Sequence, residues 1–171
     1  KRFGSKHEAG AVTEAARLGA VIASHDDTTA DHVATSSAHG VGFAEFPTTL
    51  EAAQACQAHG IAVMMGAPNL IRGGSHSGNV AAEDLAKIDL LDIVSSDYVP
   101  SALLLSAFHL AHLWDNLPRA IATVTANPAK AVQLADRGAL QRGLRGDVLR
   151  VRTFGQTPLL RGVWSRGNKV G

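Results

Sequence analysis

The chain has 171 residues, a hydrophobic fraction of 46%, a charged fraction of 18% and a formal net charge of +1. This is an ordinary globular profile, and the small net charge excludes the basic footprint of a nucleic-acid-binding domain. No apolar run approaches the roughly 18 residues of a membrane span. The single cysteine, Cys56, excludes an internal disulfide framework and favours a reducing, cytoplasmic compartment. No signal peptide is visible, and because the sequence lacks an initiator methionine we expect a chain cut from something longer.

The first part of the chain alternates short apolar runs with segments of helical composition. Ser5 with Glu8, and Thr48 with Glu51, have the spacing of a capping box and predict helix starts. The first three apolar runs begin about 20 residues apart, the length of one compact strand–helix unit. This alternation predicts the α/β class, with a parallel sheet and right-handed crossovers. The predicted strands are 20–23, 41–44, 61–65 and 90–94, and the predicted helices are 5–18, 29–38, 48–59 and 80–87.

After the fourth predicted strand the chain becomes helical and then changes texture. Asn127 and Pro128 form an N-cap and first-turn pair, which predicts a helix that closes near Gly138. From Gly146 onward the pattern is that of antiparallel strands joined by a turn, not of another strand–helix unit. We therefore expect two parts, residues 1–138 and a small β appendage at 139–171. Further predictions are helices at 102–113 and 117–125, strands at 147–151 and 162–164, and a turn at 165–168.

Polar residues follow the predicted strands, namely His25 and Asp26, Glu45, Asn69 and Asp97. The carboxyl ends of parallel strands share one edge of a sheet, so His25 and Asp97 should converge on one site. A carboxylate there is costly unless it is paired or binds a cation, and neutral imidazole is a common ligand for zinc-like ions. Simpler interpretations stay open. Asp97 could cap the next helix, Asp26 could be a cap or a supporting group, and Glu45 could be a solvated carboxylate.

The segment 66–79 is rich in glycine and also carries Arg72, His76 and two serines. Backbone N–H groups, hydroxyls and a guanidinium together suit phosphate oxygens, so we expect this loop to bind anions. It is not a Walker A loop, because no Gly-Lys-Ser/Thr follows. A flexible connector is the alternative. The predicted substrate-binding residues are Asn69, Arg72, Ser75, His76, Ser77 and Asn79.

These motifs together resemble one branch of the amidohydrolase superfamily, the PhnM-type α-D-ribose 1-methylphosphonate 5-triphosphate diphosphatases. The resemblance is carried by Ser24-His25-Asp26-Asp27, Glu45-Phe46-Pro47-Thr48-Thr49, Met65-Gly66-Ala67-Pro68-Asn69, the loop 72–79 and Ser95-Ser96-Asp97-Tyr98. The tail, with Asn127-Pro128-Ala129-Lys130, Asp136-Arg137-Gly138 and Arg145-Gly146-Asp147, resembles the superfamily's C-terminal segment. The resemblance implies the C-terminal half of a (β/α)8 barrel in residues 1–138. It also implies strands of a small β-sandwich in residues 139–171.

The resemblance also implies a divalent metal ion, zinc, manganese or cobalt, bound by His25 and Asp97. Asp97 would in addition take the proton of the attacking water, with Asp26 and Glu45 as supporting residues. The superfamily's first-strand His-x-His pair and its fourth-strand bridging residue have no counterpart here. A closed barrel typically needs about 250 residues. We therefore expect this chain to need a partner that completes the barrel, either a missing N-terminal half or a second copy. We also expect the isolated chain to be inactive.

The implied function is a metal-dependent hydrolase of phosphonate catabolism. It would release pyrophosphate from α-D-ribose 1-methylphosphonate 5-triphosphate, a phosphorylated small molecule, with no role for nucleic acid or membrane. Two alternatives remain. One is another amidohydrolase that cleaves a C–N bond, such as a deacetylase or cyclic amidase. The other is a non-catalytic phosphate-binding α/β module, because a doubly wound sheet could present the same polar edge.

Overall fold

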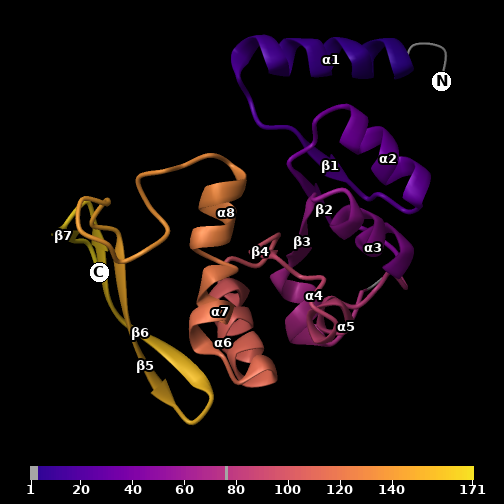
Figure 1. Ribbon diagram of the computed structural model, residues 1–171. Helices are drawn as coiled ribbons and strands as arrows, with labels where there is room; N and C mark the ends of the chain where they lie inside the picture. Colours follow the sequence, from indigo (N-terminus) through magenta and orange to yellow (C-terminus); the bar gives the residue numbers. More distant parts are fainter. Residues whose placement is uncertain (1–3, 76) are drawn as a thin grey trace.

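The computed structural model describes residues 4–75 and 77–171 and contains one parallel and one antiparallel sheet. The parallel sheet has four strands in the order β1-β2-β3-β4, so each strand pairs with the next in sequence (Figure 1). The predicted α/β arrangement with a parallel sheet is confirmed. The strands are β1 (Ala23–His25), β2 (Phe43–Glu45), β3 (Ala62–Gly66) and β4 (Ile93–Ser95).

Each strand begins one to three residues later than predicted from its apolar run. The register pairs His25 with Glu45, so both polar residues close their strands rather than follow them. The prediction placed the strands on their apolar residues, whereas the hydrogen-bonded ladder extends to the polar end. This shift positions His25 and Glu45 directly at the carboxyl edge of the sheet.

Helices connect and cover the strands. Thr29 and Thr49 cap α2 and α3 with their side chains, as the preference for hydroxyl residues at N-caps leads us to expect. The predicted capping box from Thr48 is wrong by one residue, and Glu51 instead accepts a bond of 2.9 Å from the Ala30 amide. The helices are α1 (Gly4–Leu18), α2 (Ala30–Ala38), α3 (Leu50–Ala58), α4 (Ala67–Arg72), α5 (Ala82–Lys87), α6 (Ala102–Trp114), α7 (Leu117–Ala122) and α8 (Ala126–Ala131). None of the described helices is long and apolar enough to cross a membrane.

Two predicted segments differ from the structure. Residues 67–72 were expected to be loop but form α4, which tolerates Pro68 in its first turn and ends at Gly73 with φ 76°. The helix predicted to run from Asn127 to Gly138 is only α8, and Asn127 lies inside it rather than at its N-cap. The side chain of Asn127 instead donates to the Asp92 carbonyl at 2.7 Å, so tertiary contact replaces the local cap.

The parallel sheet has one covered face and one more open face. Residues of β2, β3 and β4 on the covered face are buried against α2, α3, α5 and α6. The opposite face is only partly buried at β2 and β3 and exposed at Ala23 and His25 of β1. The covered face consists of Ala44, Val63, Met65 and Val94, and the more open face includes Phe43, Glu45, Ala62 and Met64.

The C-terminal residues form an antiparallel sheet of β5 (Val148–Phe154), β6 (Thr157–Ser165) and β7 (Asn168–Lys169), as the tail pattern predicted. This sheet lies apart from the parallel sheet, beside α6 (Figure 1). Gly146 and Gly167 pack so closely that a Cβ on Gly146 would lie 2.9 Å from the Gly167 nitrogen. Asp147 ties the same junction together by accepting a bond of 2.8 Å from the Arg166 amide.

Candidate functional site

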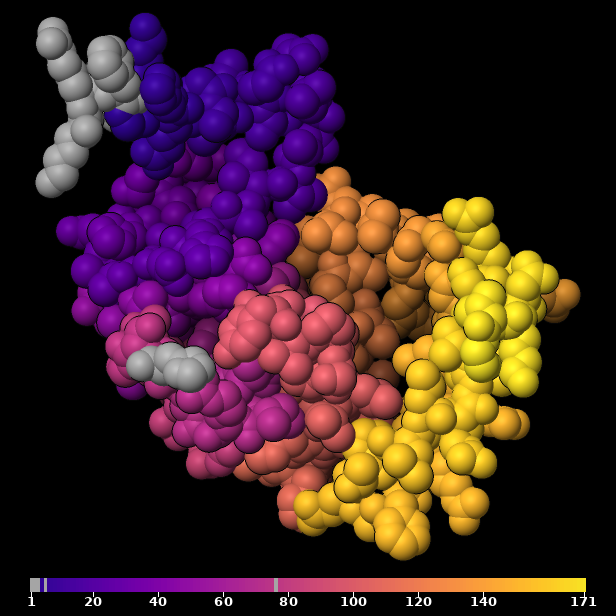
Figure 2. All heavy atoms as spheres, turned by 180° about the vertical axis from the view of Figure 1, so that it is seen from behind, coloured from indigo at the N-terminus to yellow at the C-terminus, as the bar shows by residue number. Residues whose placement is uncertain are grey.

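A pocket of about 200 Å³ lies at the carboxyl ends of the parallel strands. The segment after β4 lies against the segment after β3, in rose and magenta respectively, when the molecule is seen from behind (Figure 2). Met65, Phe46, Pro47 and Pro68 supply its apolar lining. The predicted site residues that line this pocket are Asp26, Asn69, Arg72, Ser75, Ser77, Asn79 and Asp97.

Asp97 stands where the chain turns away from β4. Its backbone has φ 51°, and its amide donates to the Ser95 hydroxyl at 3.0 Å, which fixes the turn. The Asp97 carboxylate lies directly over Gly66, so that a Cβ on Gly66 would come within 2.9 Å of Oδ2. Asp97 does not cap the following helix, because α6 has Ser101 at its N-cap and no side-chain cap bond. The carboxylate therefore faces the pocket.

His25 closes β1 on the same edge of the sheet as Asp97. Its Nδ1 lies 3.0 Å from Asp26 Oδ2, and its ring meets Phe46 edge-on at 5.3 Å between centroids. These two contacts orient the imidazole. His25 is not among the residues that line the pocket, although Asp26 is. β1 and β4 lie three strand positions apart, roughly 14 Å across a flat sheet.

Glu45 pairs with His25 in the ladder, is half-buried and lies outside the pocket lining. Its backbone carbonyl accepts a bond of 3.0 Å from the Asp26 amide, so this residue helps to shape the turn after β1. Asp27 is buried, with Ser36 Oγ 3.3 Å from its Oδ2. Its carbonyl accepts from the Thr48 amide at 2.9 Å, which makes Asp27 a structural residue behind the site.

Arg72 ends α4 and extends into the pocket wall with its side chain exposed. Within residues 4–75 and 77–171, no hydrogen bond or ion pair holds its guanidinium, so its donors remain available to an anion. Ser75 and Ser77 face the same pocket, and the Ser77 amide donates to Ser75 Oγ at 3.1 Å. The predicted role of His76 lies outside the described residues.

Asn69 also lines the pocket, but its amide group is used within the protein. Oδ1 accepts from the Ala82 amide at 2.9 Å, and Nδ2 donates to the Val80 carbonyl at 3.4 Å. The backbone carbonyl of Asn69 accepts from the Gly74 amide at 2.9 Å. Asn69 thus contacts both the start and the end of the stretch that follows α4, at Gly74 and at Val80 and Ala82.

Among the lining residues that sequence reasoning missed, Tyr98 and Gly66 lie beside Asp97. Tyr98 is 64% exposed at the rim, next to Asp97. Gly66 is buried beneath the Asp97 carboxylate. Tyr98 could have been found from its position directly after a candidate carboxylate. Gly66 could not, because its role depends on a contact with a residue that lies far along the chain.

The described residues do not hold a complete metal site. In the two described ranges, no group of three or more His, Cys, Asp or Glu side chains is arranged to bind a metal ion. A catalytic zinc-type site usually has three protein ligands. The predicted sharing of a metal ion by His25 and Asp97 stays a prediction, because Asp97 lines the pocket and His25 does not.

Other reactive side chains are engaged elsewhere. Glu83 receives hydrogen bonds from Lys87 at 2.8 Å and from His109 at 3.1 Å, and these bonds, chiefly that from Lys87, lower the pKa of Glu83. Burial raises the pKa of the Cys56 thiol to about 11, so this cysteine stays protonated near neutral pH and is a poor nucleophile.

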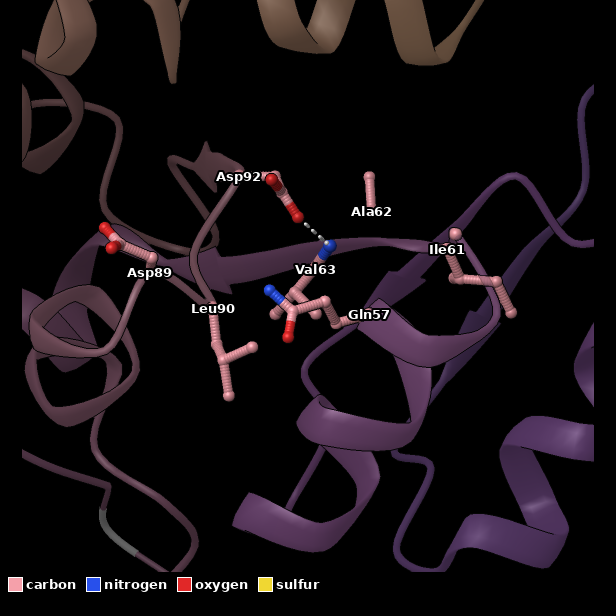
Figure 3. A pocket seen from close by; sticks show the side chains of 8 residues that line it. Gln57, Ile61, Ala62, Val63, Asp89, Leu90 and Asp92 are labelled. Carbon is pink, nitrogen blue, oxygen red and sulfur yellow. Dashed lines mark hydrogen bonds between the residues drawn. The ribbon is translucent and has the colours of Figure 1, made fainter.

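A second pocket, of about 240 Å³, lies at the opposite end of β3 and β4 (Figure 3). Its acidic residues serve the fold. Asp92 Oδ2 accepts from the Val63 amide at 2.8 Å (Figure 3). Asp89 pairs at 2.6 Å with Arg119, whose guanidinium lies 3.9 Å from the centre of the Trp114 ring. We therefore place the candidate site in the first pocket.

The sequence is 51% identical over 152 residues to the α-D-ribose 1-methylphosphonate 5-triphosphate diphosphatase of Escherichia coli strain K12. The chain is a sequence relative of this diphosphatase. The resemblance predicted from the motifs is thereby confirmed. The match covers 87% of this chain and 40% of the diphosphatase, so the chain spans less than half the length of its relative. No protein-family model matches the sequence.

Several solved structures share the fold of this chain. A prolidase in complex with N-methylphosphonate-L-proline superimposes with a TM-score of 0.69 at 18% identity, over 93% of this chain and 47% of that one. An amidohydrolase from Thermotoga maritima MSB8 gives 0.67 at 20% identity, over 88% and 43%. An ochratoxinase from A. niger gives 0.64 at 18% identity, over 92% and 43%. At these identities the likeness shows the mixed α/β fold alone.

Proposed function

We propose that this chain supplies the phosphate-binding side and part of the catalytic edge of a metal-dependent hydrolase of phosphonate catabolism. The proposed reaction is the release of pyrophosphate from α-D-ribose 1-methylphosphonate 5-triphosphate. The observation that carries the proposal is the 51% identity to the diphosphatase. The pocket adds support, because it combines Asp97 with Arg72 and two serines.

The chemistry of the pocket suits a triphosphate. The forked guanidinium of Arg72 can make paired charge-assisted bonds to phosphate oxygens, and the serine hydroxyls can add shorter-range donors. Asp97 can accept the proton of an attacking water, because its carboxylate lies over Gly66 and lines the pocket. A divalent metal ion, when bound, would lower the pKa of that water and stabilise developing charge. His25 and Asp97 would be this chain's share of its ligands.

We further propose that residues 1–138, with their parallel sheet, form one half of a (β/α)8 barrel. Residues 139–171 would add strands to a small β-sandwich. The more open sheet face supports this, as does the 40% coverage of the diphosphatase. The outer edge of β4 is partly occupied, because the Val94 amide donates to the Thr123 carbonyl at 3.0 Å. We therefore expect the other half, or a second copy, to pair first along β1.

A non-catalytic phosphate-binding module is the second candidate. It is favoured by the incomplete ligand set among the described residues, together with the free guanidinium of Arg72 in the pocket. The two candidates differ in a measurable way, because a binding module would hold triphosphate without cleaving it even after the remaining metal ligands are supplied.

A chimera tests the proposal, with this chain replacing the matching segment of the Escherichia coli diphosphatase. We expect metal-dependent pyrophosphate release by the chimera within about tenfold of the parent enzyme, a shift of roughly 1.4 kcal/mol in the barrier. A chelator should abolish it. The chain alone, with manganese, cobalt or zinc, should release none, because it carries only a partial ligand set. A folded but inactive chimera, or comparable release by the chain alone, would contradict the proposal.

Replacing Arg72 with alanine in this chimera should raise KM far more than it lowers kcat. A hydrogen bond to a charged group contributes about 1.5–3 kcal/mol, so we expect KM to rise by about 10- to 150-fold. Steady-state kinetics over a range of substrate concentrations measures both constants. Arg152→Ala is the matched control, because Arg152 is exposed on β5, outside the pocket. An unchanged KM in Arg72→Ala would exclude this residue from phosphate binding.

A further inference from the structure

The part of the glycine-rich segment that follows α4, from residue 74 to residue 82, is attached at both ends to one residue, Asn69. At its start, the Gly74 amide donates to the Asn69 carbonyl at 2.9 Å. At its end, the Asn69 side chain bonds to the Ala82 amide at 2.9 Å and to the Val80 carbonyl at 3.4 Å. The Val80 amide also donates to the Thr48 carbonyl at 2.9 Å. The segment therefore leaves the body of the protein and returns to it at fixed points.

Asn69 is itself held rigidly, because α4 is packed into the core. Ala67 and Leu70, on either side of it, are 0% and 1% exposed. The hydroxyl of Ser106 on α6, which lies 2.8 Å from the Ala102 carbonyl of its own helix, also lies 3.3 Å from the Ala67 carbonyl. A short helix with these contacts cannot shift without disturbing the core, so the position of the Asn69 amide is set by the fold and not by a ligand.

The groups between the two attachment points are the ones that face the pocket. Ser75, Ser77 and Asn79 line it together with Arg72, which belongs to the same helix as Asn69. The Ser77 amide donates a hydrogen bond of 3.1 Å to Ser75 Oγ, and this bond lies within the stretch itself. The placement of these donors therefore depends on the attachment at both ends.

We propose that Asn69 is a positioning residue for the polyphosphate site, and that it holds the hydroxyls of Ser75 and Ser77 in the pocket that Arg72 also lines. This inference rests on the proposed function, since it assumes that the pocket takes a polyphosphate. Asn69 makes no bond to the ligand in this account. Its amide acts through the loop, because both of its polar groups are already bonded to the protein.

Calorimetric titration of the full chain with inorganic triphosphate tests this role. Asn69→Ala should weaken binding about tenfold, a loss of about 1.4 kcal/mol, because the hydrogen bonds that attach the loop are removed. In a Ser75→Ala/Ser77→Ala background, the same change should add less than about twofold, because the groups it positions are gone. If Asn69→Ala fails to fold, Asn69→Ser, whose shorter side chain cannot reach both partners, should show the same pattern.

Asn127→Ala is the matched control, because the Asn127 amide also bonds to a backbone carbonyl, that of Asp92, but at the other end of the sheet. It should lower the melting temperature and leave triphosphate affinity unchanged. The positioning role alone would be overturned by either of two results. One is an unchanged affinity in Asn69→Ala, and the other is a full tenfold further loss when Asn69→Ala is added to the serine double variant. No measurable binding by the unchanged chain would overturn the proposed function and this inference together.

Discussion

Asp97→Asn should lower kcat of the chimera by about 10²- to 10⁴-fold, the usual range for loss of a general acid or base. Asparagine keeps the size of the side chain and tolerates the left-handed backbone at φ 51°, so the fold should be unaffected. What is lost is the carboxylate over Gly66, which can accept a proton or bind a cation. Pyrophosphate release at saturating substrate measures the effect, and a thermal melt checks the fold.

Asp115 offers a matched control for this substitution. It also has a left-handed backbone, at φ 47°, and an exposed side chain, but it closes α6 outside the pocket. Asp115→Asn therefore makes the same chemical change in the same backbone conformation and should leave kcat unchanged. If Asp97→Asn retained most of the parent kcat, Asp97 would be a turn residue and the catalytic role proposed for it would be wrong.

Gly66→Ala should lower kcat by about 10²-fold, comparable to the cost of misplacing a reacting group by an ångström. Gly66 has φ −77° and ψ 134°, which any residue adopts, so the backbone does not require glycine. The added Cβ would instead come within 2.9 Å of Asp97 Oδ2, and the short aspartate side chain would have to move. The variant is measured in the same kinetic assay, with folding followed by circular dichroism.

The two substitutions should not be additive, because both act on one carboxylate. In an Asp97→Asn background, Gly66→Ala should therefore change kcat little. Gly42→Ala is the control for adding a methyl group to a glycine beside the sheet. Its added Cβ would lie 3.4 Å from Val21 Cγ1, which is an ordinary van der Waals contact. A Gly66→Ala chimera with the parent kcat would show that Asp97 needs no defined position.

The parallel sheet could be predicted because its strands are apolar runs at regular spacing. Their ends could not, since His25 and Glu45 are polar residues that the ladder incorporates. The helix α4 was missed for a related reason. Gly66 and Pro68 are typical of a turn, and only burial of Leu70 against the rest of the core makes a helix there favourable.

The candidate site was predicted in outline because parallel strands bring their carboxyl ends together. Asp26 and Asp97, which follow the first and last strands, line one pocket, whereas His25, which was expected to join Asp97, does not line it. The sequence could not indicate that the Asn69 amide is bonded to Ala82, because that contact requires the loop to return to α4. It also could not indicate that Gly66 makes room for Asp97, because a residue without a side chain carries no chemical signal of its own.

The strand order β1-β2-β3-β4 also has a consequence for how the chain folds during synthesis. Each strand pairs with the one made just before it, so the sheet can grow unit by unit as the chain leaves the ribosome, without waiting for distant sequence. The pocket receives its last wall, with Asp97 and Tyr98, only when β4 joins. None of the described strands pairs with the outer edge of β1, so that edge is open to the other half or a second copy before the pocket is complete.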